Sequence, residues 1–226
     1  MRPCRRLKAQ RADRDSTLKC IAVYGASGMG REVMPLVREQ YGDRCATIVF
    51  VDDGAANGSS ILSFDEFAKL PHSEKFVTIA IADSKIRERL SLRCAHAGIQ
   101  PINIRAANAI IMNNVTLGEG VILCSFTHIT SDIHIGRHFH ANYYSYVAHD
   151  CVIGDFVTFA PGAKCNGNVH IGDHAYVGSG AVIKQGTPDK PRVIGASATI
   201  GMGAVVTNDV APGATVVGNP ARVLQK

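Results

Sequence analysis

Two neighbouring residues, His149 and Asp150, are suited to proton transfer. The chain contains nine histidines, and imidazole is the side chain that titrates nearest to neutral pH. A carboxylate beside an imidazole favours its protonated form and so raises its proton affinity. A histidine with a neighbouring carboxylate, such as His149 with Asp150, is therefore one candidate general base; the alternative is an exposed surface histidine beside a solvated turn residue.

A glycine-rich segment, Gly25–Gly30, is a candidate site for phosphate. It follows the apolar run 20–24 and precedes Arg31–Gln40, whose apolar spacing is typical of a helix. Backbone N–H groups at such a junction favour phosphate, although the spacing G-x-x-G-x-G is not the dinucleotide fingerprint. Asp52 and Asp53 follow the next apolar run, where carboxylates can accept hydrogen bonds from a ribose or a base. The alternative is a tight turn that packs the helix, followed by an ordinary acidic loop.

The N-terminal part of the chain alternates short apolar runs with helical patterns. Further apolar runs cover Ala46–Val51 and Phe76–Ala82, a helical stretch covers Ser84–Ala97, and Gln100–Ile104 is a candidate fourth strand. Short apolar runs separated by helices imply a parallel sheet with both faces covered. We therefore expect a small Rossmann-like α/β domain over residues 19–107.

A six-residue rhythm begins at about Asn108. An apolar residue recurs at Leu117, Leu123, Ile129, Ile135, Ala141, Val147, Ile153, Phe159, Cys165, Ile171, Val177 and Ile183. The register breaks at the polar segment Gln185–Arg192 and resumes at Ile194. Hexapeptide periodicity indicates a parallel β-helix, whereas antiparallel hairpins would need two-residue alternation. The prediction is a left-handed parallel β-helix over residues 108–226, with a loop at 185–192.

A longer period of 18 residues lies over the short one. It is marked by glycines that follow an aliphatic residue, at Gly118, Gly136, Gly154 and Gly172. Three hexapeptides therefore make one coil, and we expect positive φ at this glycine corner. Residues 18 apart should lie above one another by about 4.8 Å, so His149 is predicted to stack on Gly167.

Charge and cysteine usage narrow the function classes. Much of the net charge of +5 lies in the basic tail 1–18, for which we expect disorder, with an Arg-rich transit peptide as the alternative. The rest of the chain gives no argument for nucleic acid as a partner. No apolar run approaches the roughly 20 residues of a membrane span. Seven scattered cysteines without a C-x-x-C pair indicate a reducing, cytoplasmic environment.

Several of these segments together resemble one family. They are GASGMGREV after the first strand, Asp52-Asp53 after the second, the hexapeptide domain, and His149-Asp150 followed by Gly162–Asn168. The chain resembles, over about residues 19–226, the sugar acetyltransferases of the bacillosamine-pathway type and the sialic acid O-acetyltransferases. The resemblance implies a homotrimer with active sites between subunits. It also implies acetyl transfer from acetyl-CoA to the amino group of a nucleotide-linked 4-amino sugar, in surface-glycan biosynthesis.

The same resemblance implies roles for individual residues. His149 is the general base, Asp150 raises its proton affinity, and the Gly167 N–H stabilises the oxyanion. The acceptor-binding residues are Ser27, Gly28, Met29, Asp52, Asp53, Ala82 and Asn142. The residues that bind coenzyme A are Thr158, Gly167, Ser179 and Met202, and no metal is expected. Lys190 and Arg192 of the inserted loop are either partners for the coenzyme's phosphates or part of a solvated loop.

Two departures and three alternatives stay open. Met29 and Thr158 stand where the family carries histidines, so the nucleotide and the sugar are unassigned. An O-acetyltransferase acting on sialic acid or another polysaccharide sugar could use the same base. A zinc enzyme like the γ-carbonic anhydrases would use a histidine set such as His134, His170 and His174. A non-catalytic nucleotide-sugar-binding module would keep the glycine-rich segment without needing a base.

Overall fold

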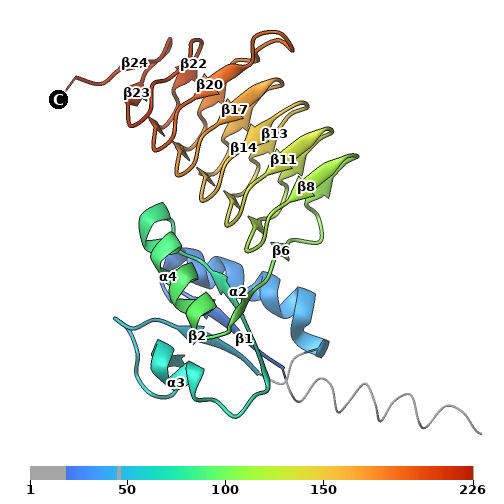
Figure 1. Ribbon diagram of the computed structural model, residues 1–226, viewed down its shortest axis with the longest axis vertical. Helices are drawn as coiled ribbons and strands as arrows, with labels where there is room; N and C mark the ends of the chain where they lie inside the picture. Colours follow the sequence, from blue (N-terminus) through green and yellow to red (C-terminus); the bar gives the residue numbers. More distant parts are fainter. Residues whose placement is uncertain (1–18, 45–46, 226) are drawn as a thin grey trace, which may run out of the picture. The chain divides into compact units, whose positions relative to one another are not determined.

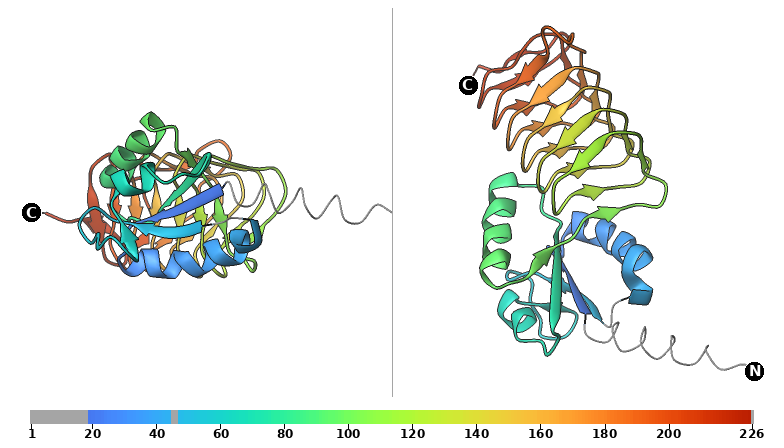
Figure 2. Two further views of the ribbon diagram at one scale, coloured as in Figure 1. Left: turned by 90° about the horizontal axis from the view of Figure 1, so that it is seen from below. Right: turned by 45° about the vertical axis from the view of Figure 1, so that its right-hand side comes forward.

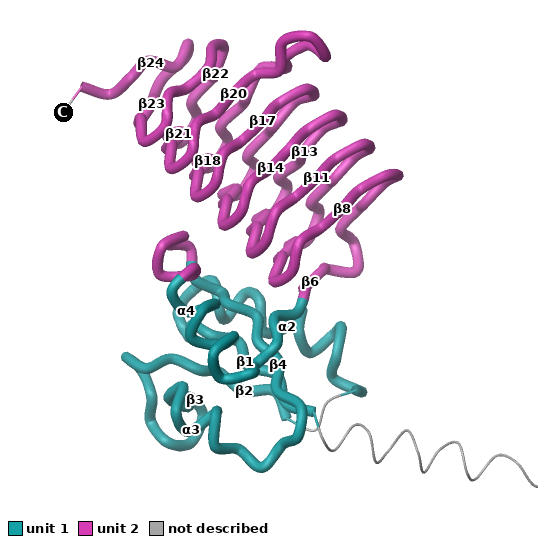
Figure 3. The backbone as a smooth tube through the Cα atoms, viewed as in Figure 1, with its two compact units in different colours: residues 1–81, 89–102 teal, residues 82–88, 103–226 magenta. Residues whose placement is uncertain are grey.

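The computed structural model describes residues 19–44 and 47–225, so the basic tail lies outside the described part. It consists of two compact units (Figure 3). Unit 1 contains the described residues up to Ile81 together with Arg89–Ile102. Unit 2 contains Ala82–Glu88 and the described residues from Asn103 onward. The units therefore divide between residues 102 and 103, five residues before the boundary at 107/108 that the sequence suggests. The segment Ala82–Glu88, which includes the start of helix α4 (Ser84–His96), is counted with unit 2.

Unit 1 is a five-stranded parallel sheet in the order β3-β2-β1-β4-β5 (Figure 1). Its strands are β1 (Lys19–Tyr24), β2 (Thr47–Val51), β3 (Ile61–Leu62), β4 (Glu74–Ile79) and β5 (Gln100–Pro101). Its helices are α2 (Gly28–Tyr41), the 3₁₀ turn η1 (Gly42–Arg44), α3 (Phe64–Ala68) and α4 (Ser84–His96). Helix α2 covers one face of the sheet, and α3 and α4 cover the other (Figure 2). No helix within 19–44 or 47–225 is long and apolar enough to cross a membrane.

Two parts of unit 1 differ from the sequence-based expectation. The short elements β3 and α3 have no clear apolar period, and α3 is instead held by a capping box: Ser63 Oγ accepts from Glu66 N–H, and Glu66 accepts from Ser63 N–H. The expected strand Gln100–Ile104 is two strands. Gln100–Pro101 completes the sheet, whereas Ile104 already pairs with Ile122 in unit 2.

Unit 2 is a stack of coils whose strands form three parallel sheets (Figure 1). The first sheet contains β7 (Ile110–Ile111), β10 (His128–Ile129), β13 (Tyr146–Val147), β16 (Lys164–Cys165), β19 (Val182–Ile183) and β22 (Val205–Val206). The second contains β8 (Val115–Leu117), β11 (Ile133–Ile135), β14 (Val152–Ile153), β17 (Val169–Ile171) and β20 (Arg192–Ile194). The third contains β6 (Ile104–Arg105), β9 (Ile122–Leu123), β12 (His140–Ala141), β15 (Thr158–Phe159), β18 (Tyr176–Val177), β21 (Thr199–Ile200), β23 (Thr215–Val217) and the antiparallel β24 (Arg222–Val223).

The hexapeptide period sets both the pairing and the core of unit 2. Val147 pairs with Cys165 and Cys165 with Ile183, which is the predicted register of 18 residues. The apolar residues of the period from Leu123 to Ile183 are all buried. Burial of each large aliphatic side chain contributes about 1.5–3 kcal/mol, so the stack is held by ladders of repeated apolar contacts. The prediction of a left-handed parallel β-helix is confirmed.

The recurrent corner glycines have a different cause from the one expected. Gly118, Gly136, Gly154 and Gly172 are not among the positive-φ residues. A Cβ at Gly154 would instead lie 2.7 Å from the backbone nitrogen of Asp173 in the next coil. Positive φ occurs two positions later, at Gly120, His138, Phe156 and His174. Close approach of successive coils, and not left-handed backbone, therefore excludes side chains at this corner.

Candidate active site

His149 lies in the turn between β13 and β14, beside the carboxylate that the sequence pairs with it. Its Nδ1 is 2.6 Å from Asp150 Oδ2, and both side chains are exposed. Asp150 has a φ of 57°, and its backbone N–H donates to the Ser131 carbonyl of the preceding coil at 3.2 Å. An ionised carboxylate at Nδ1 makes that nitrogen the donor, which leaves the Nε2 lone pair free to accept a proton.

Gly167 lies directly against this imidazole. A Cβ at Gly167 would be 2.6 Å from Nε2 and 2.5 Å from Cε1 of His149, so only glycine leaves the ring in its position. The two corners are also joined by the backbone, since Asn168 N–H donates to the His149 carbonyl at 3.0 Å. Within the described residues the Gly167 N–H has no hydrogen-bond partner. A base and an unpaired N–H donor therefore lie together, as acyl transfer requires.

A buried arginine that the sequence did not single out holds Thr158. The Arg87 guanidinium donates to Thr158 Oγ1 at 3.0 Å and to the carbonyls of His138, Phe156 and Ala82 at 3.1, 2.6 and 3.1 Å. Burial lowers the pKa of Arg87 to about 9, which still leaves it charged at neutral pH. The charged pattern of Ser84–Ala97 gives no signal that one of its arginines is buried. Two predicted ligand-binding residues, Ala82 and Thr158, thus share one anchor within unit 2.

Other predicted residues lie at a different corner of the coils. Asn142, Ser179 and Met202 are in the turns that follow β12, β18 and β21. Ser179 and Met202 are in successive coils, because Gly203 N–H donates to the Ser179 carbonyl at 2.8 Å. Within one chain, His149, Asp150 and Gly167 therefore lie together at one corner of the coils, whereas Ser179 and Met202 lie at another corner.

A basic hollow of about 390 Å³ lies beside the Gly167 corner. Its lining includes Lys184, Gly186, Lys190 and Arg192. Gly186 N–H donates to the Gly167 carbonyl at 3.0 Å, which links the two features. Arg192 is paired with Asp209 at 2.8 Å, so the two lysines supply the positive charge. An electropositive concavity of this kind suits phosphate groups.

In unit 1 the glycine-rich segment lies where β1 ends and α2 begins. The strand order reverses between β1 and β4, and ligands of open α/β sheets bind at the carboxyl ends of strands at such a point. Packing explains two glycines: a Cβ at Gly25 would lie 2.9 Å from the Ala80 carbonyl oxygen, and one at Gly30 would overlap the Gly25 carbonyl. A Cβ at Gly28, at the start of α2, would meet none of the described residues within 4 Å.

The two aspartates after β2 have different surroundings. Asp52 Oδ2 accepts from Ala26 N–H at 3.0 Å, so this carboxylate fixes the glycine-rich loop. Asp53 accepts from Tyr24 Oη at 2.7 Å, from Phe64 N–H at 2.8 Å and from Arg93 at 2.5 Å. Partial burial alone would raise the pKa of Asp53, but these hydrogen bonds outweigh it and lower the pKa. Both carboxylates therefore have partners within the unit.

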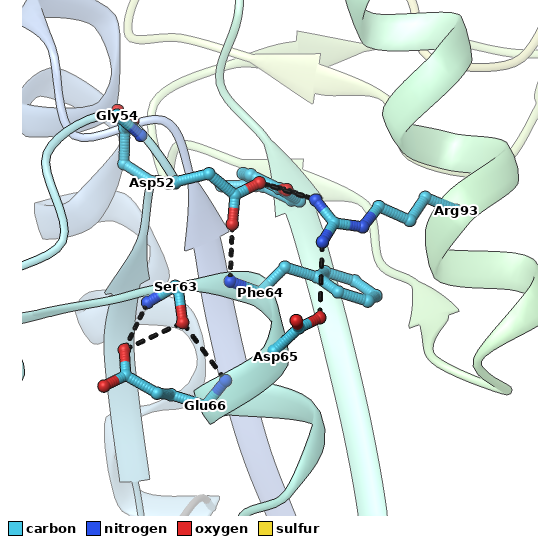
Figure 4. A network of polar contacts seen from close by, with 9 residues as sticks. Asp52, Gly54, Ser63, Phe64, Asp65, Glu66 and Arg93 are labelled. Atoms are coloured by element: carbon cyan, nitrogen blue, oxygen red, sulfur yellow. Dashed lines mark hydrogen bonds and ion pairs between the residues drawn. The ribbon is translucent and has the colours of Figure 1, made fainter.

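Arg93 extends this network to α3. Its guanidinium also pairs with Asp65 at 3.3 Å and lies 4.0 Å from the centre of the Phe64 ring (Figure 4). The Ser63–Glu66 capping box lies beside it in the same view. The network therefore fixes the start of α3 against the end of β2, and this part of the acidic loop has a structural role.

The histidines of the zinc alternative do not form a cluster. His134 pairs with Val152, and Val152 pairs with His170, so the two histidines are two strand spacings apart, about 10 Å. Across residues 19–44 and 47–225 no group of three or more His, Cys, Asp and Glu side chains could hold a metal ion.

The chain is similar to several known proteins over most of its length. Residues 20–93 match the family described as PglD N-terminal domain. The chain is 51% identical to the GDP-perosamine N-acetyltransferase of Escherichia coli O157:H7, over 90% of this chain and 96% of that protein. WeeI from Acinetobacter baumannii superposes with a TM-score of 0.89 at 58% identity, over 91% of this chain and all of that one. PerB from Caulobacter crescentus, in complex with CoA and GDP-perosamine, superposes with a TM-score of 0.82 at 25% identity, over 91% and 97% of the two chains. The chain therefore belongs to the hexapeptide-repeat family of acetyl-CoA-dependent nucleotide-sugar N-acetyltransferases.

Proposed function

We propose that this enzyme acetylates the amino group of GDP-perosamine, with acetyl-CoA as the donor. The observation that carries the proposal is the stacking of the His149–Asp150 pair on Gly167, in a chain 51% identical to a GDP-perosamine N-acetyltransferase. The replacement of family histidines by Met29 and Thr158 then belongs to the choice of sugar and not to the loss of acyl transfer.

The proposed mechanism is direct acyl transfer through a tetrahedral intermediate. The amine lone pair attacks the thioester carbonyl carbon while Nε2 of His149 removes a proton from the nitrogen. The Gly167 N–H donates to the oxygen that becomes negative. Collapse breaks the carbon–sulfur bond, and the proton on His149 passes to the departing thiolate. Asp150 stabilises the imidazolium between these two proton transfers.

The nucleotide of the acceptor is proposed to bind unit 1. Ser27, Gly28 and Met29 begin α2, where N–H groups without intrahelical partners favour a diphosphate. The Ser27 side chain makes no capping hydrogen bond to α2, and a Cβ at Gly28 would meet none of the described residues within 4 Å. Asp52 and Asp53 are proposed to shape the loop that holds the nucleoside. Ala82 and Asn142 remain proposed contacts of the sugar.

Coenzyme A is proposed to bind along the coils of unit 2, with contacts to Thr158, Gly167, Ser179 and Met202. The basic hollow offers Lys184 and Lys190 to its phosphates. Because Ser179 and Met202 lie at a different corner from Gly167, we infer that these contacts come from two neighbouring chains. This separation supports a homotrimer in which each active site lies between neighbouring subunits. Free thiols at Cys20, Cys94, Cys124, Cys151 and Cys165 support a cytoplasmic location.

The experiment is thiol release from acetyl-CoA with a panel of acceptors. The panel contains GDP-perosamine, UDP- and dTDP-linked 4-amino-4,6-dideoxy sugars, and CMP-linked and free sialic acids. Release with GDP-perosamine above all others is the expected result. Thiol release only with a hydroxyl acceptor would show O-acetylation instead of N-acetylation. No thiol release with any acceptor would favour a non-catalytic binding module.

A further inference from the structure

The peptide that joins Asn166 to Gly167 is held by several groups. The Asn166 carbonyl lies 3.3 Å from the buried thiol of Cys151 and 3.6 Å from that of Cys165, and the Cys151 thiol is also 3.5 Å from the His149 carbonyl. The Asn166 backbone N–H donates to the Ile183 carbonyl of the next coil at 3.2 Å. The orientation of this peptide is therefore fixed from within the coil and from the coil that follows.

The planarity of the peptide carries this orientation to the Gly167 N–H. In a trans peptide the C=O and the N–H point in opposite directions. Since the Asn166 carbonyl points toward buried thiols, the Gly167 N–H points away from the interior of the coil. It is the same N–H that has no partner within the described residues.

The Asn166 side chain adds two hydrogen bonds that join three successive coils. Its Nδ2 donates to the Ile183 carbonyl at 2.8 Å, and its Oδ1 accepts from Tyr146 Oη at 2.7 Å. Burial raises the pKa of Tyr146, which keeps the phenol protonated as a donor at neutral pH. Neither Oδ1 nor Nδ2 has a further partner among the hydrogen bonds of the described residues.

The repeat does not require this arrangement. The register places Ala148 below Asn166 and Lys184 above it, and neither side chain can make the same pair of hydrogen bonds. Two coils earlier in the chain, this position is occupied by Thr130. The amide therefore occurs at the one coil corner that also carries Gly167 against His149.

We propose that Asn166 and Tyr146 are positioning residues that hold the Gly167 N–H in the direction of the oxyanion. The proposal rests on the proposed function, in which Gly167 is the oxyanion donor and His149 the base. Neither residue needs to touch the substrate. Tyr146 acts through Asn166, and Asn166 acts through its peptide bond to Gly167.

The experiment compares Tyr146→Phe, Asn166→Ala and the double variant in the full-length enzyme. We expect kcat to fall about three- to tenfold for Tyr146→Phe, the effect of one hydrogen bond, and about 10- to 100-fold for Asn166→Ala. KM for acetyl-CoA and for the amino sugar should stay within twofold, and so should the shape of the pH profile of kcat. The double variant should equal Asn166→Ala, because Tyr146 acts only through that amide.

Tyr144→Phe is the matched control, since Tyr144 is exposed in the same coil and its hydroxyl makes no hydrogen bond among residues 19–44 and 47–225. It should keep wild-type kcat. Unchanged kcat in Asn166→Ala, additive losses in the double variant, or a rise in KM with constant kcat would each overturn the proposal. His149→Ala in the same assay distinguishes failure of the proposed mechanism from failure of the positioning role alone. If His149→Ala is active, the proposed mechanism fails; if it is inactive while Asn166→Ala is fully active, only the positioning role fails.

Discussion

Replacing Gly167 with alanine would put a methyl group where the His149 imidazole now lies. The added Cβ would be 2.6 Å from Nε2, whereas ordinary van der Waals contact begins at about 3.4 Å. The ring must therefore move by roughly 0.8 Å, and a misplacement of about 1 Å in a catalytic group can cost about 100-fold in rate. We expect kcat to fall by about that factor.

The same substitution should leave the fold intact. Gly167 does not have positive φ, and the side chain that must move is exposed. The assay is steady-state thiol release with acetyl-CoA and GDP-perosamine, together with thermal unfolding. In a His149→Ala background the added methyl group should have no further effect on the residual rate. Wild-type kcat in Gly167→Ala, or an equal further loss in the His149→Ala background, would refute the reasoning that joins these two residues.

Three further predictions concern the coenzyme, the coil corners and pH. Lys190→Glu should raise KM for acetyl-CoA about tenfold with little change in kcat, because it places a negative charge beside the coenzyme's phosphates, and the increase should be smaller at high salt. An unchanged KM would contradict the proposal that the basic hollow binds the coenzyme. Gly154→Ala should lower the free energy of unfolding by about 1–3 kcal/mol, because its Cβ would meet backbone atoms of the next coil. Gly42→Ala is the control: its Cβ would meet nothing within 4 Å among the described residues, and its helical backbone suits alanine, so it should not lower that free energy. Denaturant titration compares the two variants. Burial, and then neighbouring cations, lower the pKa of His138 from 6.5 to about 4. Between these two pH values the unfolded chain binds a proton at His138 that the folded chain does not. The free energy of unfolding should therefore fall as the pH drops through this interval, by about 1.4 kcal/mol per pH unit. His138→Asn should flatten that dependence, and an unchanged slope between pH 7 and 5 would contradict it.

The sequence was informative about the β-helix because its core is periodic. An apolar residue every six positions specifies which side chains point inward, and the 18-residue coil then places Gly167 on His149 without any structure. The same period could not explain the corner glycines. Positive φ and close coil approach both favour glycine, and only the distance from Gly154 to the next coil decides between them.

Contacts that depend on single side chains could not be predicted from the sequence pattern. Arg87 lies in a helix of ordinary charged composition, and its burial follows from carbonyls of His138 and Phe156 that are more than 50 residues away. Asn166 and Tyr146 are 20 residues apart, which is not the coil period, so the register alone does not pair them. The roles of Asp52 and Asp53 likewise depended on loop contacts that no pattern encodes.

The most direct test of the central claim is the rate of acetyl transfer to GDP-perosamine by His149→Ala. Removal of a general base should lower kcat by about 10²- to 10⁴-fold, with KM for acetyl-CoA and the thermal unfolding midpoint unchanged. A folded His149→Ala enzyme that turns over GDP-perosamine at the wild-type rate would contradict the account.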